Sequence, residues 1–444
     1  MSGKMTDPRV LAAEKAAIAP LESAPGPGGL AFAGALGLLF AGALGAWGWQ
    51  LLNGLEVTGL NSPVFWGVYI TDFVFFVGVS HAGTLISAIL RITDARWRTP
   101  YTRMAEMITI ASLPFAATCV IVDLGRPERA LNVILYPHLT SPILWDVVCI
   151  STYVTCSCLY FYTALIPDLA FCRDRWATRA GWRHWLYMVA ALEWTDTPLQ
   201  RRVHNRIMTG MSIALLGLVI SVHTNVGFIF GMTIKPGWHT AIIGPYFVIG
   251  AALQGLGGLG LIGVILRRVL RLEPFINEHH LNQLRRFTIA LICFWTYFTV
   301  AELLTTYYGG IPPEMLVFWS KVTGPFAWSF WGMILGCAVI PFILLVFQPG
   351  RLTAMLAWSG ALINIGMWLE RYTIVVPTAA SPFIHTLARS YVPSWVEVMI
   401  SVGWLAGFAL LLASFMRVFP VLTLWELREE VEEEHAAEHG APES

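Results

Sequence analysis

Ten apolar runs divide this chain, and each is long enough to cross a lipid bilayer as a helix. A membrane-spanning helix needs about 20 consecutive, mostly apolar residues. The runs lie at residues 30–52, 64–92, 104–122, 143–166, 207–232, 241–266, 287–308, 327–347, 352–376 and 397–419. Hydrophobic residues occupy 56% of the 444 positions and charged residues only 13%, unlike a typical soluble domain. The sequence therefore predicts an all-α polytopic membrane protein with about ten transmembrane helices.

The same runs divide the chain into three parts. We expect an N-terminal arm at 1–29, a transmembrane helical domain at 30–419 and an acidic tail at 420–444. We expect residues 182–194 to form an interfacial helix and residues 426–438 to form a solvated helix or tail. Of the 28 Lys and Arg residues, 22 fall on the side of the membrane that holds both ends of the chain, and five fall on the other side. The positive-inside rule then predicts cytoplasmic termini. The net charge of zero does not suggest a nucleic-acid partner.

Cysteine and histidine usage bears on cofactors. The seven Cys residues form no Cys-x-x-Cys pair, which argues against c-type haem attachment, a zinc knuckle or iron–sulfur ligation. A membrane b-type haem generally has two axial His residues that face each other at similar depth. The intramembrane residues His81 and His223 are expected at different depths. We therefore expect no haem, metal or iron–sulfur cluster in this chain.

A helical hairpin near the outer face carries two acids. Asp123 ends the third run just before Gly125-Arg126-Pro127, and Asp146 opens the fourth run. Charged groups at such positions are costly and are usually kept for pairing, ion transfer or ligand contact. A purely structural role also remains open for each acid. Asp123 could form an ion pair with Arg126, and Asp146 could interact with the dipole at the start of its helix.

Further ionisable residues lie inside the runs. A helix rises about 1.5 Å per residue, so the depth of each residue can be counted from the outer end of its run. This count places only His81 in the inner half of the membrane. It places seven residues in the outer half: Asp72, Asp123, Asp146, His223, Glu302 and the adjacent pair Glu370 and Arg371.

Structural roles remain open for these residues as well. Glu302 shares a helix face with Thr299 and Thr306, which favours a hydrogen-bonded packing role as much as a functional one. Glu370 and Arg371 point about 100° apart on their helix, so we expect Arg371 to neutralise an acid on another helix. His81 and His223 are equally compatible with satisfied core histidines.

Several motifs resemble one family of membrane subunits. The resemblance covers about residues 60 to 425 and rests on Trp66-Gly67-Val68-Tyr69-Ile70, on the run from His81 to Leu90, on Leu124-Gly125-Arg126-Pro127, on Ser141-Pro142-Ile143-Leu144-Trp145-Asp146, on Pro245-Tyr246-Phe247 and on the run from Asn364 to Arg371. The chain is similar to the NrfD/PsrC-type quinone-interacting subunits, and most similar to the paired subunits ActC and ActF of alternative complex III.

The resemblance implies a fold, a function and partners. Such subunits have two four-helix bundles plus flanking helices, lie in the bacterial cell (inner) membrane and carry no haem or cluster. They exchange electrons between quinone or quinol and an iron–sulfur subunit. In alternative complex III, c-type haem subunits and a homologous NrfD-like membrane subunit complete the quinol:electron acceptor oxidoreductase, which is suspected of moving protons.

The resemblance also suggests roles for residues. The family site pairs the Asp at position 146 with a residue before the Gly-Arg-Pro turn, where the ActC pattern has His and this chain has Asp123. That departure points toward ActF as the alternative identity. On the quinol hypothesis, Asp123, Asp146 and His223 accept protons.

The remaining candidates complete two hypotheses. In the quinol site, Arg126 would orient an acid, and Trp66, Tyr69 and Trp145 would line a slot open to lipid. The alternative is a proton conduit without redox contact, with steps at Asp72, His81, Glu302, Glu370 and Arg371. A structural scaffold for peripheral subunits is the third interpretation.

Overall fold

The computed structural model describes residues 7–93, 95–176, 181–347, 351–382 and 390–438, and every regular element in these ranges is a helix. The long helices are α2 (Pro27–Asn53), α3 (Val68–Ile92), α4 (Thr99–Asp123), α6 (Pro142–Arg175), α8 (Pro198–Gly231), α9 (Ile243–Val269), α10 (Glu278–Gly309), α12 (Ala327–Ile334) continued through the π-helical turn η4 (Leu335–Val339) into α13 (Ile340–Phe347), α14 (Leu352–Ala380) and α15 (Trp395–Val418). The shorter helices are α1 (Pro8–Glu22), η1 (Leu55–Val57), η2 (Arg96–Arg98), η3 (Pro127–Leu131), α5 (Asn132–Leu135), α7 (Trp182–Ala190), α11 (Pro312–Val322) and α16 (Leu424–Glu438).

Within the described ranges, nine helices are long and apolar enough to cross a membrane, counting α12 to α13 as one. The tenth predicted span is α3, which has 25 residues and an apolar stretch at Val68–His81. The predicted all-α polytopic membrane fold is therefore confirmed.

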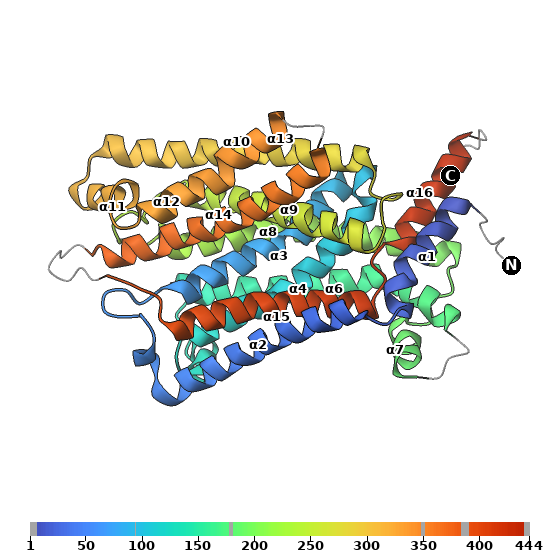
Figure 1. The fold of residues 1–444 in the computed structure, drawn as a ribbon, viewed down its shortest axis with the longest axis horizontal. Helices are drawn as coiled ribbons and strands as arrows, with labels where there is room; N and C mark the ends of the chain where they lie inside the picture. The colour runs from blue at the N-terminus through green and yellow to red at the C-terminus, as the bar shows by residue number, and fades with distance from the viewer. Residues whose placement is uncertain (1–6, 94, 177–180, 348–350, 383–389, 439–444) are drawn as a thin grey trace.

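The long helices form two bundles. Helices α3, α4, α6 and α8 pack together as the first bundle, and α9, α10, α12–α13 and α14 form the second. Helices α3 and α8 both contact α9, so the bundles join along these elements. Helices α2 and α15 pack on each other and flank the first bundle through α15 (Figure 1). This is the arrangement that the family resemblance implied.

Local sequence explains where several helices begin and how closely they approach. Thr197 and Gln200 form a capping box at the start of α8, and Ser394 and Glu397 form one at α15. In the second bundle, η4 lies directly against α14: a Cβ added to Gly336 would lie 3.0 Å from the Cα of Gly366. Small residues at such crossings bring backbones together, which favours helix association in a membrane.

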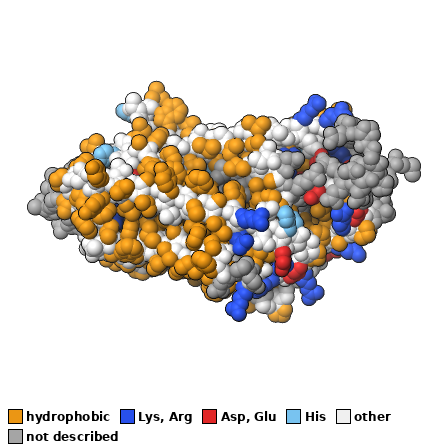
Figure 2. Space-filling model, turned by 90° about the horizontal axis from the view of Figure 1, so that it is seen from above, with side chains coloured by type: hydrophobic (Ala, Val, Ile, Leu, Met, Phe, Trp, Pro, Cys, Tyr) orange, Lys and Arg blue, Asp and Glu red, His pale blue; other side chains and the backbone are white. Residues whose placement is uncertain are grey.

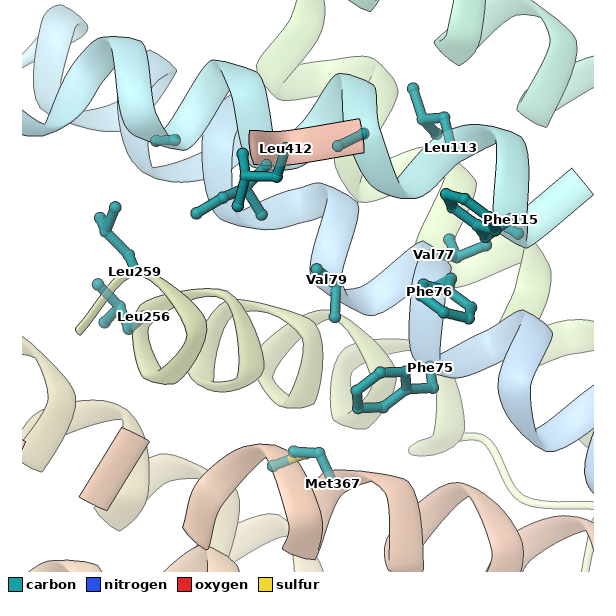
Figure 3. Close-up of a cluster of buried hydrophobic side chains, with 14 of the residues drawn as sticks. Phe75, Phe76, Val77, Val79, Leu113, Phe115, Leu256, Leu259, Met367 and Leu412 are labelled. Carbon is teal, nitrogen blue, oxygen red and sulfur yellow. The ribbon is translucent and has the colours of Figure 1, made fainter. Parts of the chain in front are cut away.

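Apolar side chains fill the junction between the bundles. Figure 3 shows Phe75 of α3 near Met367 of α14, with Phe76 next to Phe75 and Leu256 of α9 farther along the layer, and all four are buried. In lipid such contacts stabilise the fold mainly by close packing, because the tails outside are equally apolar. This layer surrounds the polar groups described below.

Both ends of the described chain lie at one end of the long helices. Helices α1, α7 and α16 gather there, and α11 lies at the opposite end (Figure 1). We call these the inner end and the outer end, following the predicted topology. Figure 2 shows a broad hydrophobic surface, with most of the charged side chains of that face near the inner end.

The inner end corrects one expectation and leaves others untested. Helix α16 was expected to be solvated, but Glu426 is buried and pairs with Arg91 and Arg98, each at 2.8 Å. The predicted interfacial helix appears as α7, which exposes Trp182 and Trp185. Residues 1–6 of the arm and 439–444 of the tail lie outside the described ranges.

Candidate functional site

Two buried histidines meet in the middle of the first bundle. His81 of α3 and His223 of α8 lie with Nε2 and Nδ1, respectively, 2.9 Å apart, and their ring centroids are 4.0 Å apart. The expectation of different depths is wrong. Counted along each helix, His81 is about 20 Å from the outer end of α3 and His223 about 12 Å from that of α8. The two outer ends therefore lie at different levels, which span limits alone do not reveal.

The hydrogen bonds assign the tautomers of this His pair. The Nδ1 of His81 lies 2.7 Å from the carbonyl of Val77 and its Nε2 lies 3.3 Å from that of Val219. Carbonyls only accept, and the shorter contact assigns the proton of a neutral ring to Nδ1. In a neutral His81 ring Nε2 is then an acceptor, and His223 donates to it from Nδ1. His223 Nε2 is left as a bare acceptor that is fully buried and has no partner among the described residues.

Asp146 lies one turn after the start of α6 and faces the bundle interior. Its side chain is only 7% exposed, and its Oδ1 has no hydrogen-bond partner in the described ranges. The side-chain amide of Asn225 is its polar neighbour and interacts with the carboxylate, and the buried Nδ2 of that amide forms no other hydrogen bond with a described residue. Asn225 follows His223 by two residues on α8, which places the acid and amide on the outer side of the His pair.

Trp145 does not join this group. It is 49% exposed, and its indole donates to the carbonyl of Leu139 at 2.8 Å, so the ring is turned to the molecular surface. Trp66 packs instead against Phe230 and Trp238, with centroids 5.7 Å from each. Trp66 and Trp145 therefore do not line one slot beside Asp146.

Asp123 lies in a different environment, between the first bundle and the α2–α15 pair. Its charged neighbour is Glu397, and it also lies near Tyr69. Tyr69 donates to Gln50 at 2.5 Å, and Gln50 donates to the carbonyl of Val122 at 2.9 Å. The structure thus does not bring Asp123 and Asp146 into one pocket, although they flank one hairpin.

Two further candidates near the outer end are Asp72, which is hydrogen-bonded between helices, and Arg126, which lies at the surface. Asp72 accepts from the indole of Trp368 at 2.7 Å and from Ser401 at 2.5 Å, which ties α3 to α14 and α15. Arg126 is exposed and forms no ion pair with Asp123 within the described ranges. It lines a shallow outer hollow together with Leu51 to Gly54.

The second bundle contains a buried ion pair. Glu370 and Arg371 are both buried and pair directly with each other, so the expectation that neighbours could not pair is wrong. The long, flexible Arg side chain bends back to the adjacent carboxylate, and the indole of Trp295 donates to Glu370 Oε1 at 2.9 Å. Arg371 lies over the ring of Phe247 at 4.9 Å.

The partner of Glu302 also differs from the expectation. Its Oε2 accepts from the hydroxyl of Thr240 at 2.9 Å, not from the same-face residues Thr299 and Thr306. Thr240 lies on the segment between α8 and α9, so the bond links this segment to α10.

Sequence reasoning missed a charged cluster in the inner half of the first bundle. Arg103 pairs with Asp168 at 2.7 Å and with Glu106 at 3.0 Å, and all three are buried. Hence His81 is not the only ionisable residue there. The i,i+3 spacing of Arg103 and Glu106 was a readable signal, whereas Asp168 fell just beyond the expected end of its span.

A polar series therefore runs through the first bundle. From the inner cluster it passes Tyr160, which bonds Ser212 at 3.2 Å, and Tyr153, whose hydroxyl donates to the carbonyl of Ser80 at 3.0 Å. The Tyr153 ring packs against His81 with centroids 5.1 Å apart. The His pair follows, and then Asn225 with Asp146. Such a series can hold and relay protons.

Comparisons with known proteins give one consistent result. Residues 56–382 match the family model described as "Polysulphide reductase, NrfD". A putative membrane subunit of a dimethyl sulfoxide reductase from Halobacterium salinarum is 25% identical, over 90% of this chain and 94% of the relative. The Hdr-like menaquinol oxidoreductase integral membrane subunit of Archaeoglobus fulgidus is 23% identical over 88% and 93%. A selenate reductase subunit of Mesobacillus selenatarsenatis is 22% identical over 84% and 89%.

Proposed function

This chain belongs to the polysulphide reductase NrfD family, and from that premise we propose that it is the quinol-oxidising membrane subunit of an alternative complex III-type oxidoreductase. The relative described as a menaquinol oxidoreductase subunit supports quinol as the substrate. The electrons pass to an iron–sulfur subunit and then to c-type haem subunits, and a second NrfD-like chain is the membrane partner. The assembly lies in the bacterial inner membrane with both termini of this chain in the cytoplasm.

The observation that carries this proposal is the environment of Asp146. The Asp146 carboxylate is buried beside the side-chain amide of Asn225 in the outer half of the first bundle, and its Oδ1 has no hydrogen-bond partner among the described residues. A carboxylate in this position accepts a hydroxyl proton as quinol loses electrons, and the amide donates to the ring oxygen. A well-placed general base of this kind contributes roughly 10²- to 10⁴-fold to the rate.

Asp123 has a secondary role in this proposal. Its neighbours are Glu397 of α15 and Tyr69, which lies on α3 and donates to Gln50 of α2, so we expect it not to share a proton with Asp146. Its place in the family motif, where ActC-like chains carry His, keeps the ActF-like identity as the alternative. In that case the chain is a sister subunit without a working quinone site.

A proton conduit is the second candidate function. The specific observation in its favour is the polar series of the first bundle, which begins at the buried cluster of Arg103, Glu106 and Asp168. Each charged group placed inside the membrane costs a few kcal/mol of stability, so such groups are usually paired with an opposite charge or retained for a function. Quinol oxidation and proton relay can operate in the same bundle.

The test of the quinol site is Asp146→Asn in the intact complex. Loss of the general base should lower quinol oxidation by roughly two orders of magnitude, with every subunit of the complex still present in its normal amount. Asp123→Asn should have a smaller effect. Asp174→Asn is the matched control, because Asp174 is on the same helix at its inner end and its side chain is 70% exposed. Normal turnover of a fully assembled Asp146→Asn complex would place the quinol site elsewhere.

A further inference from the structure

The outer end of the second bundle contains a small cavity. It lies between α9, α10, α11, α12 and α14, and its volume is about 80 Å³. Most of its wall is apolar, but six polar side chains line it: Thr240, Tyr246, Thr299, Glu302, Lys321 and Thr373. They come from both sides of the cavity and from the outer helix α11.

The size and polarity of the cavity suit a few water molecules. An apolar cavity of roughly 150 Å³ holds one benzene, whereas water occupies about 30 Å³. A space of about 80 Å³ is therefore too small for a quinone ring and large enough for two or three waters. The ammonium of Lys321 interacts electrostatically with Glu302 on the same wall and forms no hydrogen bond with another described residue, which leaves it available to donate to water. Burial lowers the pKa of Lys321 to about 8.

The floor of the cavity touches the buried ion pair of the second bundle. The hydroxyl of Tyr246 accepts from Thr299 at 3.4 Å and also interacts with the carboxylate of Glu370. Glu370 in turn pairs with Arg371. Tyr246 therefore separates the cavity from this ion pair by a single side chain.

Arg371 also faces the first bundle. Its Nε and Nη2 are buried donors without a partner among the described residues, and His223 Nε2 is the bare acceptor assigned above. Both side chains lie against Phe247, the guanidinium at 4.9 Å and the imidazole at 6.4 Å from its ring centroid. Buried donors and acceptors of this kind are usually satisfied by ordered water.

A glycine makes room for the guanidinium. A Cβ added to Gly250 of α9 would lie 3.2 Å from Arg371 Nη2 and 3.4 Å from Nη1. These distances are tighter than ordinary contact, so the present position of Arg371 depends on the absence of a side chain at residue 250.

We infer that the cavity is a hydrated proton port, and that it communicates with the His pair of the first bundle through Tyr246, the Glu370–Arg371 pair and a bridging water at His223. The route crosses between the two bundles instead of staying within one. The Tyr246 hydroxyl, the Glu370 carboxylate and the bridging water each take up one proton as they pass one on, so no net charge accumulates along the route. Arg371 keeps its charge throughout, because a guanidinium has no acceptor atom, and it holds Glu370 and the bridging water in place. This inference goes beyond the quinol site and does not depend on the position of that site.

The first test measures hydration without any turnover. Hydroxyl radicals generated in the water should oxidise Met333, on the cavity wall, on the order of tenfold faster than Met367 in the dry core of Figure 3, because the radicals form only where water is present. Both side chains are buried in the described structure, which makes Met367 a matched control. Equal, slow oxidation of both residues shows a dry cavity and overturns the inference.

The second test measures proton release by the intact complex in liposomes. Tyr246→Phe removes the hydroxyl, and Gly250→Ala displaces Arg371 without removing any titratable group. Both should lower the protons released per electron toward the one that quinol oxidation itself supplies, with uncoupled turnover within twofold of wild type. Tyr162→Phe is the control, since that hydroxyl donates to the carbonyl of Ala190 at the inner end.

The outcomes separate this inference from the proposed function. An unchanged proton-to-electron ratio in both variants overturns the port, whatever the position of the quinol site. A wild-type ratio of one overturns it as well. A normally active Asp146→Asn complex overturns the quinol site alone and leaves the hydration result intact.

Discussion

Replacement of Arg103 by Leu should destabilise the protein more than any single exposed-charge substitution. Arg103 is fully buried and satisfies two carboxylates, Asp168 at 2.7 Å and Glu106 at 3.0 Å. It also donates to the carbonyl of Ala164 at 3.0 Å. Leucine preserves apolar contact in the bundle but leaves two buried acids without their cation.

The expected magnitude follows from what remains after the change. Ala164 keeps a second donor, the indole of Trp425 at 3.1 Å, and Asp168 keeps the Trp425 backbone amide at 3.2 Å. The main cost is therefore the unpaired charge. Removing one partner of a buried ion pair costs about 3–5 kcal/mol, so we expect the free energy of unfolding to fall by that amount.

The assay is reversible unfolding in mixed micelles, followed by tryptophan fluorescence. Arg175→Ala is the control, because its ion pair with Glu22 at 3.6 Å is substantially exposed and should contribute about 0–1 kcal/mol. The double variant Arg103→Leu with Asp168→Leu should cost less than the sum of the single changes, since it removes the cation together with one of its two carboxylates. A cost for Arg103→Leu no larger than that of the control, or strict additivity of the two changes, would refute this reasoning.

Two further predictions concern the outer and inner ends. Burial lowers the pKa of Lys321 to about 8, and only a neutral amine reacts with an acylating reagent. The rate at which a short pulse of reagent labels Lys321 should therefore level off above about pH 8, whereas the rate for an ordinary lysine rises to about pH 10.4. Mass spectrometry of the labelled peptide measures this rate, and a continued rise at Lys321 above about pH 8 contradicts the prediction. With 22 of 28 Lys and Arg residues on the side of the termini, a reporter fused after Glu438 should be active only in the cytoplasm; activity of an external reporter at that position would reverse the topology.

The positions of the membrane helices could be predicted because they depend on one-dimensional composition. Apolar run limits agree closely with α2, α9 and α15, where loops flank the run on both sides. The agreement fails at α8, which begins at Pro198 instead of near residue 207. Its first turns carry Arg201 and Arg202, so hydropathy excluded them. The capping box of Thr197 and Gln200 was the local signal for the true start.

An extended helix end also explains why Asp168 was missed. Helix α6 continues to Arg175, beyond the expected limit at residue 166, so Asp168 lies inside the bundle instead of in a loop. A hydropathy window treats an acid as the end of a span. In this bundle Arg103 compensates that acid and the helix continues past it.

The candidate site depended on information that a linear sequence does not contain. Whether His81 meets His223 is set by the vertical offset and the rotation of two helices separated by 142 residues. A half-turn of rotation in either helix would put one ring on another face, with unchanged hydropathy. The same limit applies to Asp123 and Asp146, whose short connection suggested a shared pocket. Asp123 ends α4 on the side that faces Tyr69, and Asp146 starts α6 on the side that faces Asn225. Because the two acids are close in the chain, both lie at the outer end of the first bundle. The direction in which each side chain points does not follow from that closeness, and it decides which acid can act as the base.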